Sequence, residues 1–169
     1  ILIDLWECEN KNGLEVYFAD YVIIENMTVR AAGHKHSRGI RLTHSKGRII
    51  RNNKVYGAGH ANLFCSLSDN TRFENNEAYE GQIGIYVADS TDYPVITANI
   101  LHDNSAIGLH INGDRHSGGD GTISHAIIEN NIIYNNGNTG INCDGVTESI
   151  LRNNVIYNNS KRGIAFFKG

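Results

Sequence analysis

A short motif recurs along the chain and constrains the fold more than any other sequence feature. It has the form Ile50-Arg-Asn-Asn-Lys-Val55, with apolar ends around a polar centre. The fourth position of the motif falls at Met27, Asn53, Asn76, Asn99, Asn131 and Asn154, so successive copies are 26, 23, 23, 32 and 23 residues apart. A second motif, Gly-Ile or a close variant, keeps the same spacing at Gly39, Asn62, Gly84, Gly108, Gly140 and Gly163. Two motifs with one common period indicate a repeat protein.

The length and content of the repeat favour one coil of a β-solenoid. A unit of about 23 residues is too short for a pair of helices and contains three short, β-branched apolar runs. Along Gly84-Ile-Tyr-Val-Ala88, Ile85 and Val87 point one way while Tyr86 points the other. The inward column should then be Leu42, Cys65, Val87, Ile111, Cys143 and Phe166. We predict an all-β, single-stranded parallel β-helix of about six to seven coils.

The Asn-Asn step of the motif predicts a tight turn between two strands of each coil. Asparagine adopts left-handed backbone geometry at less cost than most residues. Stacked side-chain amides of Asn53, Asn76, Asn99, Asn131 and Asn154 can also hydrogen-bond from coil to coil, which predicts an asparagine ladder. A second column is expected to be an outer aromatic stack of Tyr56, Tyr79, His102, Tyr134 and Tyr157.

Composition excludes several classes of protein. Lys plus Arg is 15 and Asp plus Glu is 18, so a net charge of −3 argues against nucleic acid as a partner. Charged residues make up 20% and hydrophobic residues 40% of the chain, which indicates a folded domain. No apolar run approaches the roughly 18 residues that span a membrane. Three cysteines, Cys8, Cys65 and Cys143, form no CxxC pair and indicate neither a disulfide framework nor a zinc site.

The repeated pattern, seen in Asn130-Asn-Ile-Ile-Tyr-Asn-Asn136 followed by Gly140-Ile141, resembles the right-handed parallel β-helix repeat of the pectin-lyase-like superfamily. It is most similar to the repeats of bacterial secreted proteins and covers roughly residues 13–169. The resemblance implies a secreted, periplasmic or cell-surface location. Relatives include polysaccharide lyases, uronan epimerases, glycosidases and periplasmic metal-loading proteins, so it implies a carbohydrate-directed activity without fixing which one.

Residues 1–169 are expected to form one β-helix domain in which residues 1–12 are irregular or a partial first coil. No amphipathic capping helix is evident before Gly13, and the chain stops partway through a coil. Because a solenoid needs caps, we expect either a fragment of a longer β-helix or end-to-end association of identical chains.

Departures from the repeat are the expected places for function. The 32-residue step contains a polar, glycine-rich loop, residues 112–125, with Asp114, Arg115, His116 and Asp120. Asp114 and Asp120 are candidate oxygen ligands for Ca²⁺, although their spacing does not match an EF-hand loop. A smaller insertion spans residues 31–38. Its His34 and His36, with His60 one coil further on, raise the alternative of a transition-metal site.

The outward side chains of the Gly-Ile strands should form one exposed face. Phe64 and Tyr86 are candidate stacking surfaces for sugar rings, and Asn112, Asn142 and His116 are candidate substrate-binding residues. His110 is the candidate base for proton abstraction beside a uronate carboxylate. Arg41 lies three coils from His110, about 14 Å away, so Arg115 is the better candidate to stabilise the developing charge.

These residues lead to two hypotheses of different classes. The first is recognition of an acidic polysaccharide along the strand face and the 112–125 loop, with lyase or epimerase action through His110, Arg115 and Asp144. The sequence does not identify a cofactor, and Ca²⁺ is one candidate. The second is a non-catalytic β-helix scaffold or adhesion segment of a larger secreted protein. The two differ in whether the candidate side chains converge in one groove.

Overall fold

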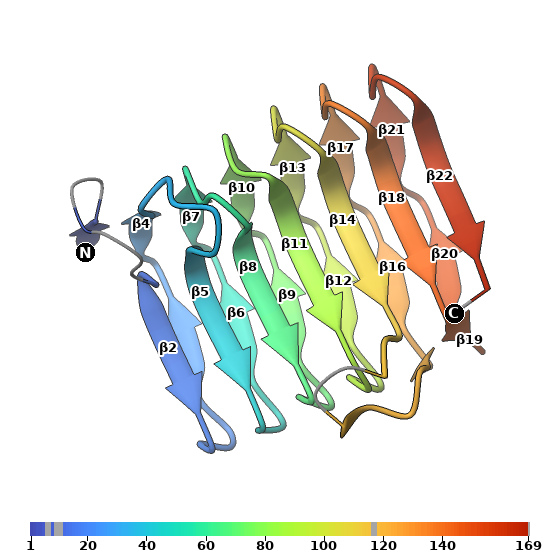
Figure 1. The fold of residues 1–169 in the computed structure, drawn as a ribbon, viewed down its shortest axis with the longest axis horizontal. Coiled ribbons are helices and arrows are strands. Elements are labelled where there is room, and N and C mark those ends of the chain that lie inside the picture. The colour runs from blue at the N-terminus through green and yellow to red at the C-terminus, as the bar shows by residue number, and fades with distance from the viewer. Residues whose placement is uncertain (6–7, 9–11, 116–117, 169) are drawn as a thin grey trace.

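The computed structural model describes residues 1–5, 8, 12–115 and 118–168 and is a right-handed parallel β-solenoid of about seven turns. Each full coil contributes one strand to each of three sheets, and Figure 1 shows the strands stacked side by side along the axis. No described helix is long and apolar enough to cross a membrane. The predicted fold class is therefore confirmed.

The three sheets are named A, B and C. Sheet A contains β1 (Leu2–Asp4), β4 (Thr28–Arg30), β7 (Lys54–Tyr56), β10 (Glu77–Tyr79), β13 (Ile100–His102), β17 (Ile132–Tyr134) and β21 (Val155–Tyr157). Sheet B contains β2 (Leu14–Tyr17), β5 (Arg38–Thr43), β8 (Ala61–Ser66), β11 (Ile83–Ala88), β14 (Ile107–Asn112), β18 (Thr139–Asp144) and β22 (Arg162–Phe167). Sheet C contains β3 (Ile23–Glu25), β6 (Ile49–Arg51), β9 (Arg72–Glu74), β12 (Val95–Thr97), β16 (Ile127–Glu129) and β20 (Ile150–Arg152). A small fourth sheet pairs β15 (Ile123–Ser124) with β19 (Val146–Thr147).

The core fills the space between the three sheets. Within sheet B, the predicted inward column is confirmed, since Leu42, Cys65, Val87, Ile111 and Cys143 are fully buried. Phe166 continues this column by pairing with Cys143 but is 61% exposed, because it lies in the last described coil. Within sheet A, β1 pairs with β4, which fits a partial first coil; residues 6–7 and 9–11 lie outside the described residues.

The asparagine ladder lies at the turn between sheets C and A, as predicted. Asn76 Nδ2 donates to Asn99 Oδ1 at 3.0 Å and to the Ile50 carbonyl at 2.8 Å. The same pattern links successive ladder asparagines from Asn53 to Asn154. The residue before each ladder asparagine takes the left-handed conformation, with φ between 51° and 57° at Asn52, Asn75, Ala98, Asn130 and Asn153. The two asparagines of the motif thus have separate roles.

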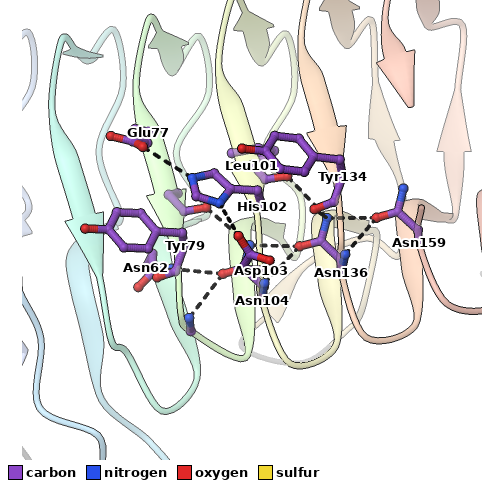
Figure 2. Close-up of polar contacts among 12 residues, drawn as sticks. Asn62, Glu77, Tyr79, Leu101, His102, Asp103, Asn104, Tyr134, Asn136 and Asn159 are labelled. Carbon is purple, nitrogen blue, oxygen red and sulfur yellow. Dashed lines mark hydrogen bonds and ion pairs between the residues drawn. The ribbon is translucent and has the colours of Figure 1, made fainter. Parts of the chain in front are cut away.

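A second asparagine ladder, which sequence reasoning missed, lies at the turn between sheets A and B. Asn104 Nδ2 donates to Asn136 Oδ1 at 3.0 Å, and Asn136 Nδ2 donates to Asn159 Oδ1 at 2.9 Å (Figure 2). Asn62, two coils earlier, extends this ladder, because its Nδ2 donates to Asn104 Oδ1 at 3.1 Å. Gly81 stands in the intervening coil, where a Cβ would lie only 2.7 Å from Asn62 Nδ2. A side chain there would break this contact.

The predicted aromatic stack is confirmed on the outer face of sheet A. Tyr56, Tyr79, His102, Tyr134 and Tyr157 lie with neighbouring ring centroids 5.0 Å apart and interplanar angles of 4° to 9°. His102, the one histidine in this stack, also contacts two carboxylates. His102 Nδ1 lies 2.7 Å from Asp103 Oδ2 and Nε2 lies 3.2 Å from Glu77 Oε1 (Figure 2).

Replacing a ladder asparagine should destabilise the solenoid much more than replacing the asparagine before it. Asn76→Ala leaves the Ile50 carbonyl and the Asn53 amide without their side-chain partner, and we expect a loss of about 2–4 kcal/mol in unfolding free energy. Asn75→Ala is the matched control, because Ala98 already occupies the equivalent left-handed position. Urea denaturation measures both; equal losses for the two variants would contradict the division of roles.

Candidate functional site

The outer face of sheet B carries the predicted row of side chains. Strict register places Phe64, Tyr86, His110 and Asn142 on successive coils, and we call these four residues the sheet B platform. The Phe64 and Tyr86 rings meet edge to face at 5.4 Å, and the Tyr86 and His110 rings stack at 4.7 Å with an interplanar angle of 10°. The platform is therefore a continuous row of rings that ends in an amide. The expectation of an exposed face is wrong at Phe64, which is 6% exposed because the Arg38 guanidinium lies over its ring.

His110 and Asp144 form a hydrogen-bonded pair at the polar end of the platform. His110 Nε2 lies 2.9 Å from Asp144 Oδ2, and Asn142 Nδ2 donates to the same oxygen at 2.8 Å. His110 Nδ1 is buried and has no hydrogen-bond partner among the described residues. An Nε2–H donated to Asp144 leaves the lone pair on Nδ1, so a substrate proton reaches this nitrogen only after a neighbouring side chain moves.

Tyr86 is held at the centre of the platform by Asn112, another predicted substrate-binding residue. Asn112 Nδ2 donates to the Tyr86 hydroxyl at 3.1 Å. Burial raises the pKa of Tyr86, so the phenol stays protonated at neutral pH and can donate a hydrogen bond to a ligand.

The 112–125 loop is anchored to the turn after β11. Asp120 accepts hydrogen bonds from the Ser90 hydroxyl at 2.7 Å and from the Thr122 amide at 2.8 Å. The bond from Ser90 is the main reason that the pKa of Asp120 is lowered. The loop encloses a hollow of about 570 Å³ lined by Asn112, Gly113, Asp114, Arg115, Asp120, Gly121 and Thr122.

The sequence-predicted site residues thus fall into two groups. Arg115 and Asp120 line the loop hollow, whereas His110 and Asp144 pair with each other on the sheet B platform. The proposed support of His110 by Arg115 and the proposed Ca²⁺ ligation stay predictions. His116 lies outside the described residues.

The candidate metal sites show no convergence in the part of the chain that the structure describes. No three His, Cys, Asp or Glu side chains there come together as ligands for one ion. His60, grouped by sequence with His34 and His36, instead lies against the rings of Phe64 and Tyr86, at 6.2 Å and 5.5 Å between centroids. Its surroundings are those of the sheet B platform.

A smaller hollow at the start of the sheet B platform was missed by sequence reasoning. It measures about 270 Å³ and is lined by Arg38, His60, Phe64, Tyr86, Ala88, Asp89 and Asp114, and we call it the Arg38 hollow. The guanidinium carbon of Arg38 lies 4.2 Å from the centroid of the Phe64 ring. Asp114 lines both hollows, so the 112–125 loop does reach the platform. The sequence feature that could have predicted this hollow is the position of Arg38 at the start of a Gly-Ile strand.

A third hollow, of about 700 Å³, lies along the turns between sheets A and B. Its lining combines Arg30, Tyr56, Glu80, Gln82, Asp103 and Ser105 with glycine and alanine backbone. Asp103, which precedes the ladder residue Asn104, is part of this lining. None of the sequence-predicted site residues lines this hollow.

Comparisons with known proteins agree with this architecture. The family model described as a right-handed beta helix region matches residues 5–119. No curated protein matches. A mutant of the periplasmic alginate epimerase AlgG superposes with a TM-score of 0.80 and 18% identity over 94% of this chain and 35% of its own. A second AlgG structure gives a TM-score of 0.71 and 16% identity over 99% of this chain and 38% of its own. The chain therefore spans little more than a third of the length of these neighbours, whose likeness shows the fold.

His60 should titrate well below the usual range of a histidine. Burial, followed by the charge of Arg38, lowers the pKa of His60 from 6.5 to about 4. As the pH falls from 6.5 to 4, the unfolded chain takes up this proton and the folded chain does not, so the unfolding free energy decreases. A His60→Gln variant should lose this part of the pH dependence in urea denaturation. An NMR titration midpoint of the His60 ring near 6.5 would contradict the assignment.

Proposed function

The chain belongs to the right-handed β-helix family, and we propose that this domain binds an acidic polysaccharide along the sheet B platform. The observation that carries the proposal is the register of sheet B, which aligns Phe64, Tyr86, His110 and Asn142 in a row along the solenoid axis. The structural neighbours of this chain are structures of the alginate epimerase AlgG, and alginate is an acidic polysaccharide.

The chemistry of the platform fits such a polymer. Aromatic faces contact the apolar faces of sugar rings, while a tyrosine hydroxyl and an asparagine amide bond sugar hydroxyls. At the start of the platform β5 carries Arg38 and Arg41, of which Arg41 pairs with Glu15 at 3.0 Å. Since the net charge of the chain is −3, Arg38 rather than a bulk field provides the attraction for an acidic chain.

Proton transfer at His110 is the second candidate function, and it is favoured by the His110–Asp144 pair. A carboxylate that accepts from one ring nitrogen fixes the tautomer, and the other nitrogen can act as a base. In this scheme, Arg115 or a Ca²⁺ ion held by Asp114 and Asp120 stabilises the charge that develops on the uronate carboxylate. Either β-elimination or epimerisation can follow from the same proton abstraction.

The structural likeness to AlgG supports a secreted, periplasmic or cell-surface location, since AlgG is a periplasmic protein. End-to-end association of identical chains also stays a prediction.

Removing the central ring of the platform should weaken polysaccharide binding. Tyr86→Ala loses a stacking surface and a hydroxyl, and we expect at least a tenfold higher Kd for an alginate or polygalacturonate oligomer, about 1.4 kcal/mol. Tyr134→Ala is the matched control, because it removes a stacked tyrosine from the outer face of sheet A. Affinity electrophoresis and calorimetry measure the effect. Equal weakening by both variants, or no binding by the parent protein, would favour the non-catalytic scaffold hypothesis.

His110→Ala should separate binding from turnover. We expect binding to weaken less than in Tyr86→Ala, because the edge-to-face pair of Phe64 and Tyr86 remains, and turnover to fall by at least a hundredfold if His110 is the base. Epimerisation is read from incorporation of solvent deuterium into the polymer, and β-elimination from ultraviolet absorbance of the unsaturated product. Full turnover by His110→Ala would exclude His110 as the base, and a parent protein with neither signal would leave binding as the function.

A further inference from the structure

Unsatisfied polar atoms concentrate on the outer face of sheet B. Among the described residues, seven buried side-chain nitrogen or oxygen atoms lack a hydrogen-bond partner. Five of these belong to sheet B or the residue before β8, namely Arg38 Nε, Arg41 Nε, Thr43 Oγ1, His60 Nδ1 and His110 Nδ1, and the other two belong to Arg48. Because buried polar groups in native proteins are nearly always bonded, these atoms need partners that ordered water or a ligand would supply.

We infer that the Arg38 hollow binds a single sugar-acid residue, with its carboxylate on Arg38 and its hydroxyl groups on Asp89 and Asp114. The inference deepens the proposed function and rests on it. The lining of the hollow combines one cation, Arg38, with two carboxylates, Asp89 and Asp114, and the rings of Phe64 and Tyr86. A sugar acid has the complementary arrangement of one anionic group and several hydroxyl donors.

Arg38 has the properties of an anion-binding side chain. Its guanidinium lies over the Phe64 ring, which fixes the plane of the fork. Unlike Arg41, which pairs with Glu15 at 3.0 Å, the Arg38 guanidinium forms no ion pair among the described residues. Its Nη1 donates to the His36 carbonyl at 3.4 Å. Burial lowers the pKa of Arg38, and the nearby charge of Arg41 adds to this effect. A bound carboxylate would offset both costs through bidentate hydrogen bonds.

The two carboxylates of the lining lead us to expect that a bare anion binds poorly. Asp89 is 6% exposed and accepts a hydrogen bond from the Ser66 hydroxyl, so its carboxylate is held in place. Two carboxylates repel sulfate or phosphate but accept hydrogen bonds from sugar hydroxyls. The volume of about 270 Å³ lies just below the range of roughly 300–1,000 Å³ usual for drug-sized ligands, which suits one ring.

Binding of small probes tests the inference without a polymer. Mannuronate and glucuronate, their neutral methyl esters, and inorganic sulfate are titrated into the whole chain while ring signals of His60 and Tyr86 are followed by NMR. We expect the uronates to bind at least tenfold more tightly than either the esters or sulfate. Arg38→Gln should remove this preference. Arg152→Gln is the matched control, because Arg152 pairs with Glu129 on sheet C at 2.6 Å.

Arg38→Lys keeps the charge without the planar fork, and we expect its uronate affinity to lie between those of the parent and Arg38→Gln. If Arg38→Gln fails to fold, Arg38→Lys tests the role of Arg38 in its place. Asp114→Asn should bring sulfate affinity closer to uronate affinity, because one repelling charge is lost. Unchanged uronate affinity in Arg38→Gln, or equal affinity for uronate and sulfate in the parent, would overturn the inference.

The outcomes also separate the inference from the proposed function. If Arg38→Gln retains full polymer binding while Tyr86→Ala loses it, the platform function stands and the uronate subsite is wrong. If uronate monosaccharides bind through Arg38 but no polymer is retained, the subsite stands and the polysaccharide function is wrong.

Discussion

The in-register parallel pairing of successive coils is the constraint on which the rest of the structure depends. Every residue of a strand lies beside its counterpart in the next coil, as Tyr86 lies between Phe64 and His110. Strand bonds alone leave the turns unpaired, and the two asparagine ladders bond them from coil to coil. A shift of register by one residue would turn every buried side chain outward. The ladders and the core therefore select the same register.

This register also builds the candidate site, because it converts a sequence period into rows of side chains on three outer faces. Sheet A carries a row of stacked rings with His102, which contacts two carboxylates, at its centre. Sheet B carries shorter rows of rings, amides and an imidazole–carboxylate pair, bordered by Arg38 and by the 112–125 loop. Among the described residues, only sheet B combines aromatic rings, buried unpartnered nitrogens and an inserted loop. These features favour sheet B as the face proposed to bind a ligand.

The fold and the rows could be predicted because they follow from period and alternation alone. The first ladder, the core column and the sheet B platform all lie where the repeat places them. The second ladder was missed because its column is interrupted: Asn104, Asn136 and Asn159 recur at one repeat position, but Gly81 stands there one coil earlier and Asn62 joins from a different position. The loop contacts were missed for a different reason. Whether Asp120 bonds Ser90 or a ligand depends on the path of an insertion, which has no counterpart in the repeat.

The most direct test of the account is a comparison of side-chain signals on two faces of the same molecule during polymer binding. NMR of the aromatic rings is recorded while an acidic oligosaccharide is added. If the polymer binds along the sheet B platform, we expect the ring signals of Tyr86 and His110 on sheet B to shift together, while those of His102 and Tyr134 on sheet A stay constant. Shifts confined to sheet A, or spread equally over both sheets, would contradict it.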